Sequence, residues 1–294
     1  MTVHIHLGAH KTASTHIQAI LKKNAATLAE AKVTTVRPRD VRAAVGTVRE
    51  RLKHPLLGAL SGLAQRRAMK RLARLGRGAD RLVAADENTL GLCADVIASG
   101  TLYADAGPRS GLWAGLTAGR EVTVYLAIRA YPSFFASVHA QAGRNARYEP
   151  LLPHQAAALA ALPRRWPDVI DDVRQALPNA KLILWAYEDY AAVRPEILRL
   201  MTGLNDLQPV AIRPMRTPTA PAMDALAAAG RLGPVTEKMR AEIIAQHPHV
   251  KGAAAYSPWT PDQRARMRTA YAEDLALLKD RYGPQFLAAS QEHS

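Results

Sequence analysis

The chain has 294 residues, of which 48% are hydrophobic, and it carries a formal net charge of +14. No run of about 18 apolar residues is present, so we expect no transmembrane helix, and a single cysteine, Cys93, excludes an intramolecular disulfide. The first residues lack the basic and apolar regions of a secretory signal, and we therefore expect a soluble, cytoplasmic protein.

Short apolar runs predict buried strands, which alternate along the chain with helical patterns. The predicted strands are Thr2–Leu7, Val33–Val36, Leu82–Ala85, Val122–Ile128 and Lys181–Tyr187. Helices are predicted at about 17–31, 40–76, 130–144, 154–176 with breaks at Pro163 and Pro167, 194–202, 235–246 and 261–282. The Pro-rich stretch 205–234 is predicted to be irregular. This alternation favours an α/β fold with a mostly parallel sheet flanked by helices.

Much of the positive charge lies in one segment. Between Arg37 and Arg81, thirteen Lys and Arg residues stand against three acids, a net charge of +10. A solvated helix face, an anionic glycan and an anionic membrane are all compatible with this pattern. Because the segment contains no Phe, Tyr or Trp, nucleic acid is disfavoured as a partner.

Ligands of such sheets bind at the carboxyl ends of the strands. The first strand is followed by Gly8-Ala9-His10-Lys11-Thr12-Ala13-Ser14-Thr15 and then by a helix. Backbone N–H groups, the helix dipole, the Lys11 ammonium and three hydroxyls would together bind a phosphate. A triphosphate loop of the form G-x-x-x-x-G-K-[ST] fits less well, because Gly8 precedes Lys11 by only three residues. An ordinary polar turn is the remaining alternative.

The run from His6 to Thr15 resembles the 5′-phosphosulfate loop of the sulfotransferases that use 3′-phosphoadenosine 5′-phosphosulfate (PAPS). It is most similar to a bacterial branch with the pattern H-x-G-x-H-K-T-G-[ST]-T, and this chain has Ala13 where that pattern has Gly. The resemblance implies that the nucleotide contacts are made by Gly8, Lys11, Thr12, Ala13, Ser14 and Thr15.

Two further stretches carry the same resemblance. Family members bind the 3′-phosphate with an Arg at a strand end and a Ser eight residues later, which here are Arg129 and Ser137. A strand that ends in Tyr-Glu-Asp would bring Tyr187 near the adenine. More loosely, Lys251-Gly252 resembles part of a 3′-phosphate clamp. The resemblance thus implies a single sulfotransferase-like α/β domain over residues 1–294, related to the P-loop nucleotide-binding proteins. It would have a basic helical insertion at about 40–78 and a helical C-terminal segment at about 235–285.

The implied activity is transfer of the sulfuryl group of PAPS to a hydroxyl or amine, with 3′,5′-ADP as the product and no metal. Lys11 would stabilise the leaving group, and the acceptor could be a glycan, a lipid or a small molecule. Glu87, just past a strand end, is the expected base if burial or its neighbour Asp86 raises its pKa. His10 is the second candidate, and Asp40 and His139 are more distant ones.

Other interpretations stay open at this point. His4 and His6 alternate on a strand, but no third metal ligand is evident beside them. A small-molecule kinase would need Mg²⁺ and a carboxylate to hold the ion. A protein that only binds polyanions would use the 37–81 basic segment. The leucines within residues 56–75 would allow that segment to lie on the inner membrane as an amphipathic helix.

Overall fold

The computed structural model describes residues 1–43, 67, 68, 70–142, 149–211, 217–250 and 255–289. Its centre is a six-stranded, all-parallel sheet with the strand order β2-β3-β1-β4-β5-β6. The strands are β1 (Thr2–Gly8), β2 (Val33–Val36), β3 (Arg81–Ala85), β4 (Val122–Ile128), β5 (Ala180–Ala186) and β6 (Phe286–Leu287). The predicted α/β class and parallel sheet are confirmed.

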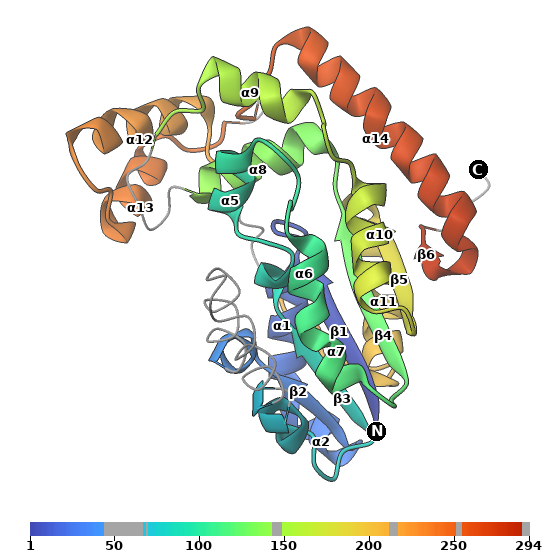
Figure 1. Cartoon of the computed structure of the whole chain (residues 1–294). Helices are drawn as coiled ribbons and strands as arrows, with labels where there is room; N and C mark the ends of the chain where they lie inside the picture. Colours follow the sequence, from blue (N-terminus) through green and yellow to red (C-terminus); the bar gives the residue numbers. More distant parts are fainter. Residues whose placement is uncertain (44–66, 69, 143–148, 212–216, 251–254, 290–294) are drawn as a thin grey trace, which may run out of the picture.

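Helices cover both faces of the sheet (Figure 1). One face packs against α1 (Ser14–Lys23), α2 (Ala25–Glu30) and α11 (Tyr190–Thr202). The other face packs against α5 (Cys93–Ser99), α6 (Ala106–Ser110), α7 (Ala114–Thr117), α8 (Tyr131–Ala142), α9 (Pro153–Ala160), α10 (Trp166–Ala176) and α14 (Pro261–Tyr282). Because both faces are buried, the strands are apolar without strict alternation, which is why they could be recognised in the sequence.

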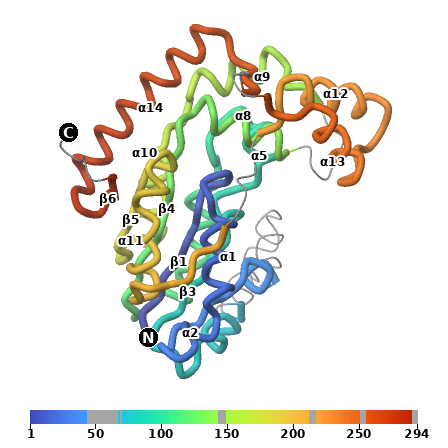
Figure 2. Tube along the Cα trace, turned by 180° about the vertical axis from the view of Figure 1, so that it is seen from behind, coloured from blue at the N-terminus to red at the C-terminus, as the bar shows by residue number. Residues whose placement is uncertain are grey.

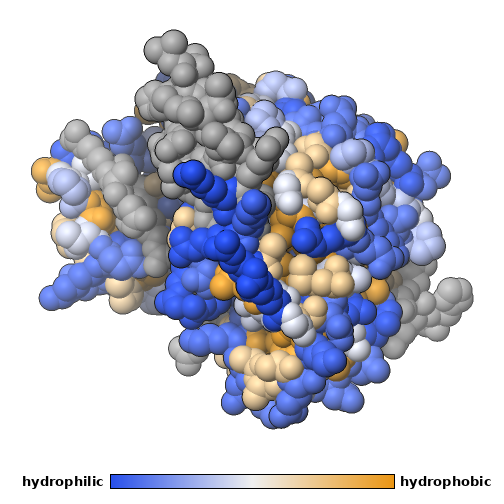
Figure 3. Space-filling model, turned by 60° about the horizontal axis from the view of Figure 1, so that its bottom comes forward, coloured by the Kyte–Doolittle hydropathy of each residue, from blue (hydrophilic) through white to orange (hydrophobic). Residues whose placement is uncertain are grey.

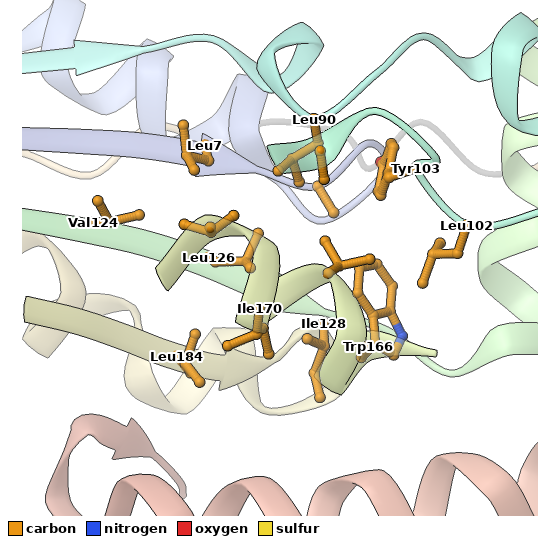
Figure 4. Packing of buried hydrophobic residues seen from close by; sticks show 14 of the residues in the cluster. Leu7, Leu90, Leu102, Tyr103, Val124, Leu126, Ile128, Trp166, Ile170 and Leu184 are labelled. Carbon is orange, nitrogen blue, oxygen red and sulfur yellow. The ribbon is translucent and has the colours of Figure 1, made fainter. Parts of the chain in front are cut away.

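Buried side chains on one face of the sheet pack against helix α10. Leu7, Leu126 and Leu184 come from three neighbouring strands and lie with Ile170 and Trp166 of α10 (Figure 4). All five side chains have no exposed surface. This packing fixes the carboxyl ends of β1, β4 and β5 relative to one another.

Several predicted boundaries are corrected. The helix expected over 17–31 is two helices, because the buried Asn24 ends α1 and bonds to the carbonyls of Ile20 and Gln208. The helix expected from Arg194 begins four residues earlier, at Tyr190. Pro163 separates α9 from α10 as predicted, but Pro167 causes no break, since it lies in the first turn of α10 where its missing N–H costs nothing.

The prediction of irregular structure over 205–234 is wrong for its second half. Residues Ala220–Leu232 form α12, which is capped by the Thr219 hydroxyl and begins with a proline in its first turn. The prolines that suggested a loop therefore precede and start a helix. The helices α13 (Glu237–Gln246) and α14 agree with the predicted 235–246 and 261–282. With α12, helix α13 projects from one end of the molecule (Figures 1 and 2).

The basic segment is only partly described. Residues 38–43 and 70–75 are helical, while 44–66 and residue 69 lie outside the described residues. No helix in the described part of the chain is both long enough and apolar enough to cross a membrane. On the face that Figure 3 shows, hydrophilic residues predominate and hydrophobic ones form patches between them.

Candidate functional site

The order of the strands creates a crossover point at β1. After β1 the chain forms β2 and β3 on one side of it, and then crosses to β4 and β5 on the other side. In open parallel sheets, ligands bind outside the carboxyl ends of the strands at such a point. The segments that follow β1, β3, β4 and β5 there begin with Ala9, Asp86, Arg129 and Tyr187.

The loop after β1 has an unusual backbone. Gly8, Lys11 and Ala13 have φ angles of 74°, 62° and 68°, whereas Thr12 between the last two lies outside the left-handed region. Alternation of handedness turns successive N–H groups toward one point, which is the geometry of an anion-binding nest. A Cβ on Gly8 would lie 2.7 Å from the Ser14 Oγ atom, so no larger residue fits there.

Two hydroxyls tighten this loop from within. The Thr12 Oγ1 atom donates to the Ala9 carbonyl at 2.7 Å and accepts from the Ala9 N–H at 3.3 Å. The Ser14 hydroxyl also donates to the Ala9 carbonyl, at 3.4 Å. Both side chains are buried, whereas Thr15 is exposed. Thr12 and Ser14 thus shape the loop from inside it.

The backbone amides at the start of α1 remain available. Ala13 is the N-cap residue and makes no side-chain cap. Within the described ranges, the N–H groups of Thr12, Ala13, Ser14 and Thr15 donate to no protein acceptor. The positive end of the α1 dipole lies at the same place. Together they form a site for an anion with several negatively charged oxygens.

His10 is held by Tyr103 and Asn88. Its backbone N–H donates to the Tyr103 hydroxyl oxygen at 2.9 Å, its Nδ1 atom lies 2.9 Å from that oxygen, and its Nε2 atom lies 3.0 Å from Asn88 Oδ1. Burial lowers the pKa of His10, so the ring is neutral. A neutral ring that donates from Nε2 accepts at Nδ1 from the Tyr103 O–H. Both ring nitrogens are therefore engaged, which leaves His10 poorly placed to accept a substrate proton.

Arg129 binds the loop from the end of β4. Its Nη1 atom donates to the Lys11 carbonyl at 2.7 Å, and its Nε atom donates to the Ser133 hydroxyl at 3.1 Å. The guanidinium carbon lies 4.6 Å from the centre of the Tyr187 ring, within the range of a cation–π contact. The structure thus brings Lys11, Arg129 and Tyr187 together, as expected.

Ser137 is near these residues but is not bonded to Arg129. Ser133, Ser137 and Gln141 are spaced four residues apart along α8 and lie on one face of it, which we call the α8 polar stripe. Ser133 bonds to Arg129, and Gln141 accepts from the Lys11 ammonium at 3.4 Å. Ser137 stands between them, with its hydroxyl 2.7 Å from that of Thr217. Ser133 and Gln141 were not expected, although their spacing from Ser137 could have indicated them.

Glu87 lies at the end of β3, beside the loop. Its carboxylate accepts from Gln18 Nε2 at 3.2 Å and from Arg42 Nη2 at 3.2 Å, and Arg42 Nε also donates to the buried Asp86 at 2.8 Å. Burial raises the pKa of Glu87, but a hydrogen bond from its own backbone N–H, the charge of Arg42 and the hydrogen bond from Gln18 outweigh burial and lower it. The expected rise is therefore not found. Arg42 had not been foreseen as a site residue.

The other candidates lie elsewhere. Asp40 pairs with Arg37, while His139 bonds to the Glu149 carbonyl and to the Tyr256 hydroxyl. Lys251 and Gly252 lie outside the described residues.

In the described part of the chain, no three His, Cys, Asp or Glu side chains gather as a metal site would require. A hollow of about 640 Å³ between α11 and β6 contains none of the loop residues.

No protein-family model and no curated protein matches this sequence.

Proposed function

We propose that this protein is a sulfotransferase that takes its sulfuryl group from PAPS. The observation that carries the proposal is the hydrogen bond between Arg129 and the Lys11 carbonyl, because it puts a guanidinium next to a nest of open backbone amides. The two groups suit two separate phosphates on one nucleotide, at its 5′ and 3′ positions. The strand order around β1 is compatible with a P-loop-like architecture.

Each residue has a role in this proposal. The amides of the loop hold the 5′-phosphosulfate, and Arg129 binds the 3′-phosphate, with Ser137 beside it. The Tyr187 ring packs near the adenine. When the acceptor oxygen bonds to sulfur, the bond from sulfur to the bridging oxygen breaks and its electron pair stays on 3′,5′-ADP. Lys11, which can leave its contact with Gln141, stabilises that negative charge.

Glu87 is the base that the geometry favours. It is ionised at neutral pH, since its pKa is lowered, and it lies beside the loop, two residues past the end of the neighbouring strand β3. The acceptor proton would pass to its carboxylate as the new oxygen–sulfur bond forms. His10 is less suited, because both its ring nitrogens already have partners and neither has a second lone pair, whereas each carboxylate oxygen of Glu87 can accept more than one hydrogen bond.

A kinase would use Asp86 and Glu87 to hold Mg²⁺ next to the loop. In this structure both carboxylates bond to the guanidinium of Arg42, which occupies the place between them and offsets part of their charge. That contact favours the sulfotransferase over the kinase. The acceptor stays open among glycan, lipid and small molecule. The basic segment over 37–81 could bring an anionic acceptor or an anionic membrane surface to the protein.

Calorimetry with 3′,5′-ADP tests the proposal, with and without Mg²⁺, on the wild type and on Lys11→Ala. We expect binding that does not depend on Mg²⁺ and that weakens at least tenfold in Lys11→Ala, as for loss of one charge-assisted contact. Lys22→Ala is the matched control, because this exposed lysine lies in the last turn of α1, away from the loop that precedes the helix. Mg²⁺-dependent binding of ATP without binding of 3′,5′-ADP would instead identify the kinase.

A further inference from the structure

The turn that carries Arg129 is held by polar contacts on both sides. The carbonyl of Arg129 accepts from Trp166 Nε1 at 2.9 Å, and the next backbone N–H, of Ala130, donates to Glu188 Oε1 at 3.1 Å. Glu188 follows Tyr187 directly, and the Tyr187 ring lies against the Arg129 guanidinium. The segment after β5 therefore holds both the backbone and the side chain of Arg129.

The C-terminal helix α14 reaches this turn with one buried face. The hydroxyl of Tyr271, a residue that is 7% exposed, donates to Glu188 Oε2 at 2.7 Å. One turn further along α14, the buried Asp274 accepts from the hydroxyl of Tyr131, the first residue of α8. Figures 1 and 2 both show α14 running along the outside of the molecule, past α8 and α10. Polar groups of a distant helix thus bond to the two segments that flank Arg129.

We propose that Tyr271 is a positioning residue for Arg129, acting through Glu188. Without the Tyr271 hydroxyl, the Ala130 N–H is the one protein donor left to the Glu188 carboxylate among the described residues. The carboxylate is then held less firmly, and so are the Ala130 turn that it bonds and the neighbouring Tyr187 ring. The guanidinium would then sample more orientations. The bonds within the phosphate loop, from Thr12 to Ala9 and from His10 to Tyr103, do not involve α14. The inference rests on the proposed nucleotide site.

The test compares affinities for 3′,5′-ADP and for 5′-AMP, which differ only in the 3′-phosphate that Arg129 would bind. In Tyr271→Phe we expect the preference for 3′,5′-ADP to fall about three- to tenfold, the size of one hydrogen-bond contribution. The affinity for 5′-AMP should change less than twofold. Glu188→Gln, which keeps the shape of the side chain and removes its charge, should lower the preference in the same direction.

Tyr282→Phe is the matched control, because Tyr282 lies on α14 about three turns beyond Tyr271. It should leave the preference unchanged. If Tyr271 were only structural, its substitution would lower the melting temperature or both affinities equally, and an unchanged ratio in Tyr271→Phe would overturn the inference. A wild type that shows no preference for 3′,5′-ADP would instead overturn the proposed role of Arg129, and with it the proposed function.

Discussion

The guanidinium of Arg129 donates a 2.7 Å hydrogen bond to the carbonyl oxygen of Lys11, a residue 118 positions earlier in the sequence. This bond fixes the strand-end arginine to the backbone of the phosphate loop. Burial lowers the pKa of Arg129, although Tyr187 and Glu188 oppose that effect. The arginine therefore has two tasks, because it supports the loop and offers its remaining N–H groups to a ligand.

Arg129→Ala should accordingly weaken the binding of two ligands to different extents. We expect a loss of about ten- to a hundredfold for 3′,5′-ADP, since a charged partner of the 3′-phosphate disappears. For 5′-AMP, which has no 3′-phosphate, the affinity should fall only a few-fold, because the loop loses its hydrogen bond from Arg129 to the Lys11 carbonyl. Calorimetry with both ligands measures this difference. Arg199→Ala, on the exposed side of α11, should change neither affinity, and equal losses in Arg129→Ala would refute the 3′-phosphate role.

Ala13→Gly should stabilise the protein slightly. Ala13 has a φ of 68°, and this left-handed conformation costs an L-residue about 1–2 kcal/mol that glycine does not incur. Part of this stabilisation is offset, because glycine increases the conformational entropy of the unfolded chain. The free energy of unfolding in urea should therefore rise by about 0.5 kcal/mol, with ligand affinity kept.

Ala19→Gly, in the middle of α1, is the control of opposite sign and should lower the free energy of unfolding by about 1 kcal/mol. If Ala13→Gly destabilised the protein as much as Ala19→Gly, the left-handed conformation at residue 13 would be wrong.

The local parts of the site could be predicted from the sequence. A buried strand, a short polar loop and a helix are encoded by neighbouring residues, so the sequence alone indicates Gly8, Lys11 and the end of β4 at Arg129. The sequence does not indicate the positive φ angle of Lys11, because lysine has no preference for that conformation.

Long-range partners could not be predicted. Arg42, Tyr103 and Tyr271 each contact the site from a segment far along the chain, and no local pattern marks them. The direction of the Glu87 pKa shift depends in part on such a partner, the charge of Arg42, and in part on a hydrogen bond from the Glu87 backbone N–H, which requires the exact local geometry. Helix α12 was missed because prolines indicate a loop unless their place in the first turn is known.

Tyr103→Phe should destabilise the loop. The hydroxyl accepts from the His10 backbone and donates to its ring, so its loss leaves two buried polar groups of His10 without partners. We expect the free energy of unfolding to fall by about 1–3 kcal/mol and the affinity for 3′,5′-ADP to fall as well. Urea titration and calorimetry measure the two effects.

Tyr125→Phe is the matched control for that experiment. Its hydroxyl lies 2.9 Å from His4 Nδ1, toward the other end of β1, so it also forms a buried Tyr–His pair. It should reduce stability without changing nucleotide affinity. If both variants left nucleotide binding intact, the Tyr103–His10 contact would have no part in shaping the loop.

Acid should destabilise the protein through His6. Burial lowers the pKa of His6 from 6.5 to about 4, an effect that the charge of Glu87 only partly opposes. Between these values the unfolded chain binds a proton that the folded protein does not, so stability is complete above pH 6.5 and is lost as the pH falls toward 4. The loss from this residue should reach up to about 3 kcal/mol.

His6→Leu removes the titrating ring and tests that expectation. Neither ring nitrogen of His6 has a hydrogen-bond partner among the described residues, so an apolar side chain of similar size should be tolerated at neutral pH. Urea titrations between pH 7 and pH 4.5 should show a flatter dependence on pH in His6→Leu than in the wild type. The same change at the exposed His154 should leave the slope as it is. Equal slopes in His6→Leu and the wild type would show that His6 is not the group that titrates.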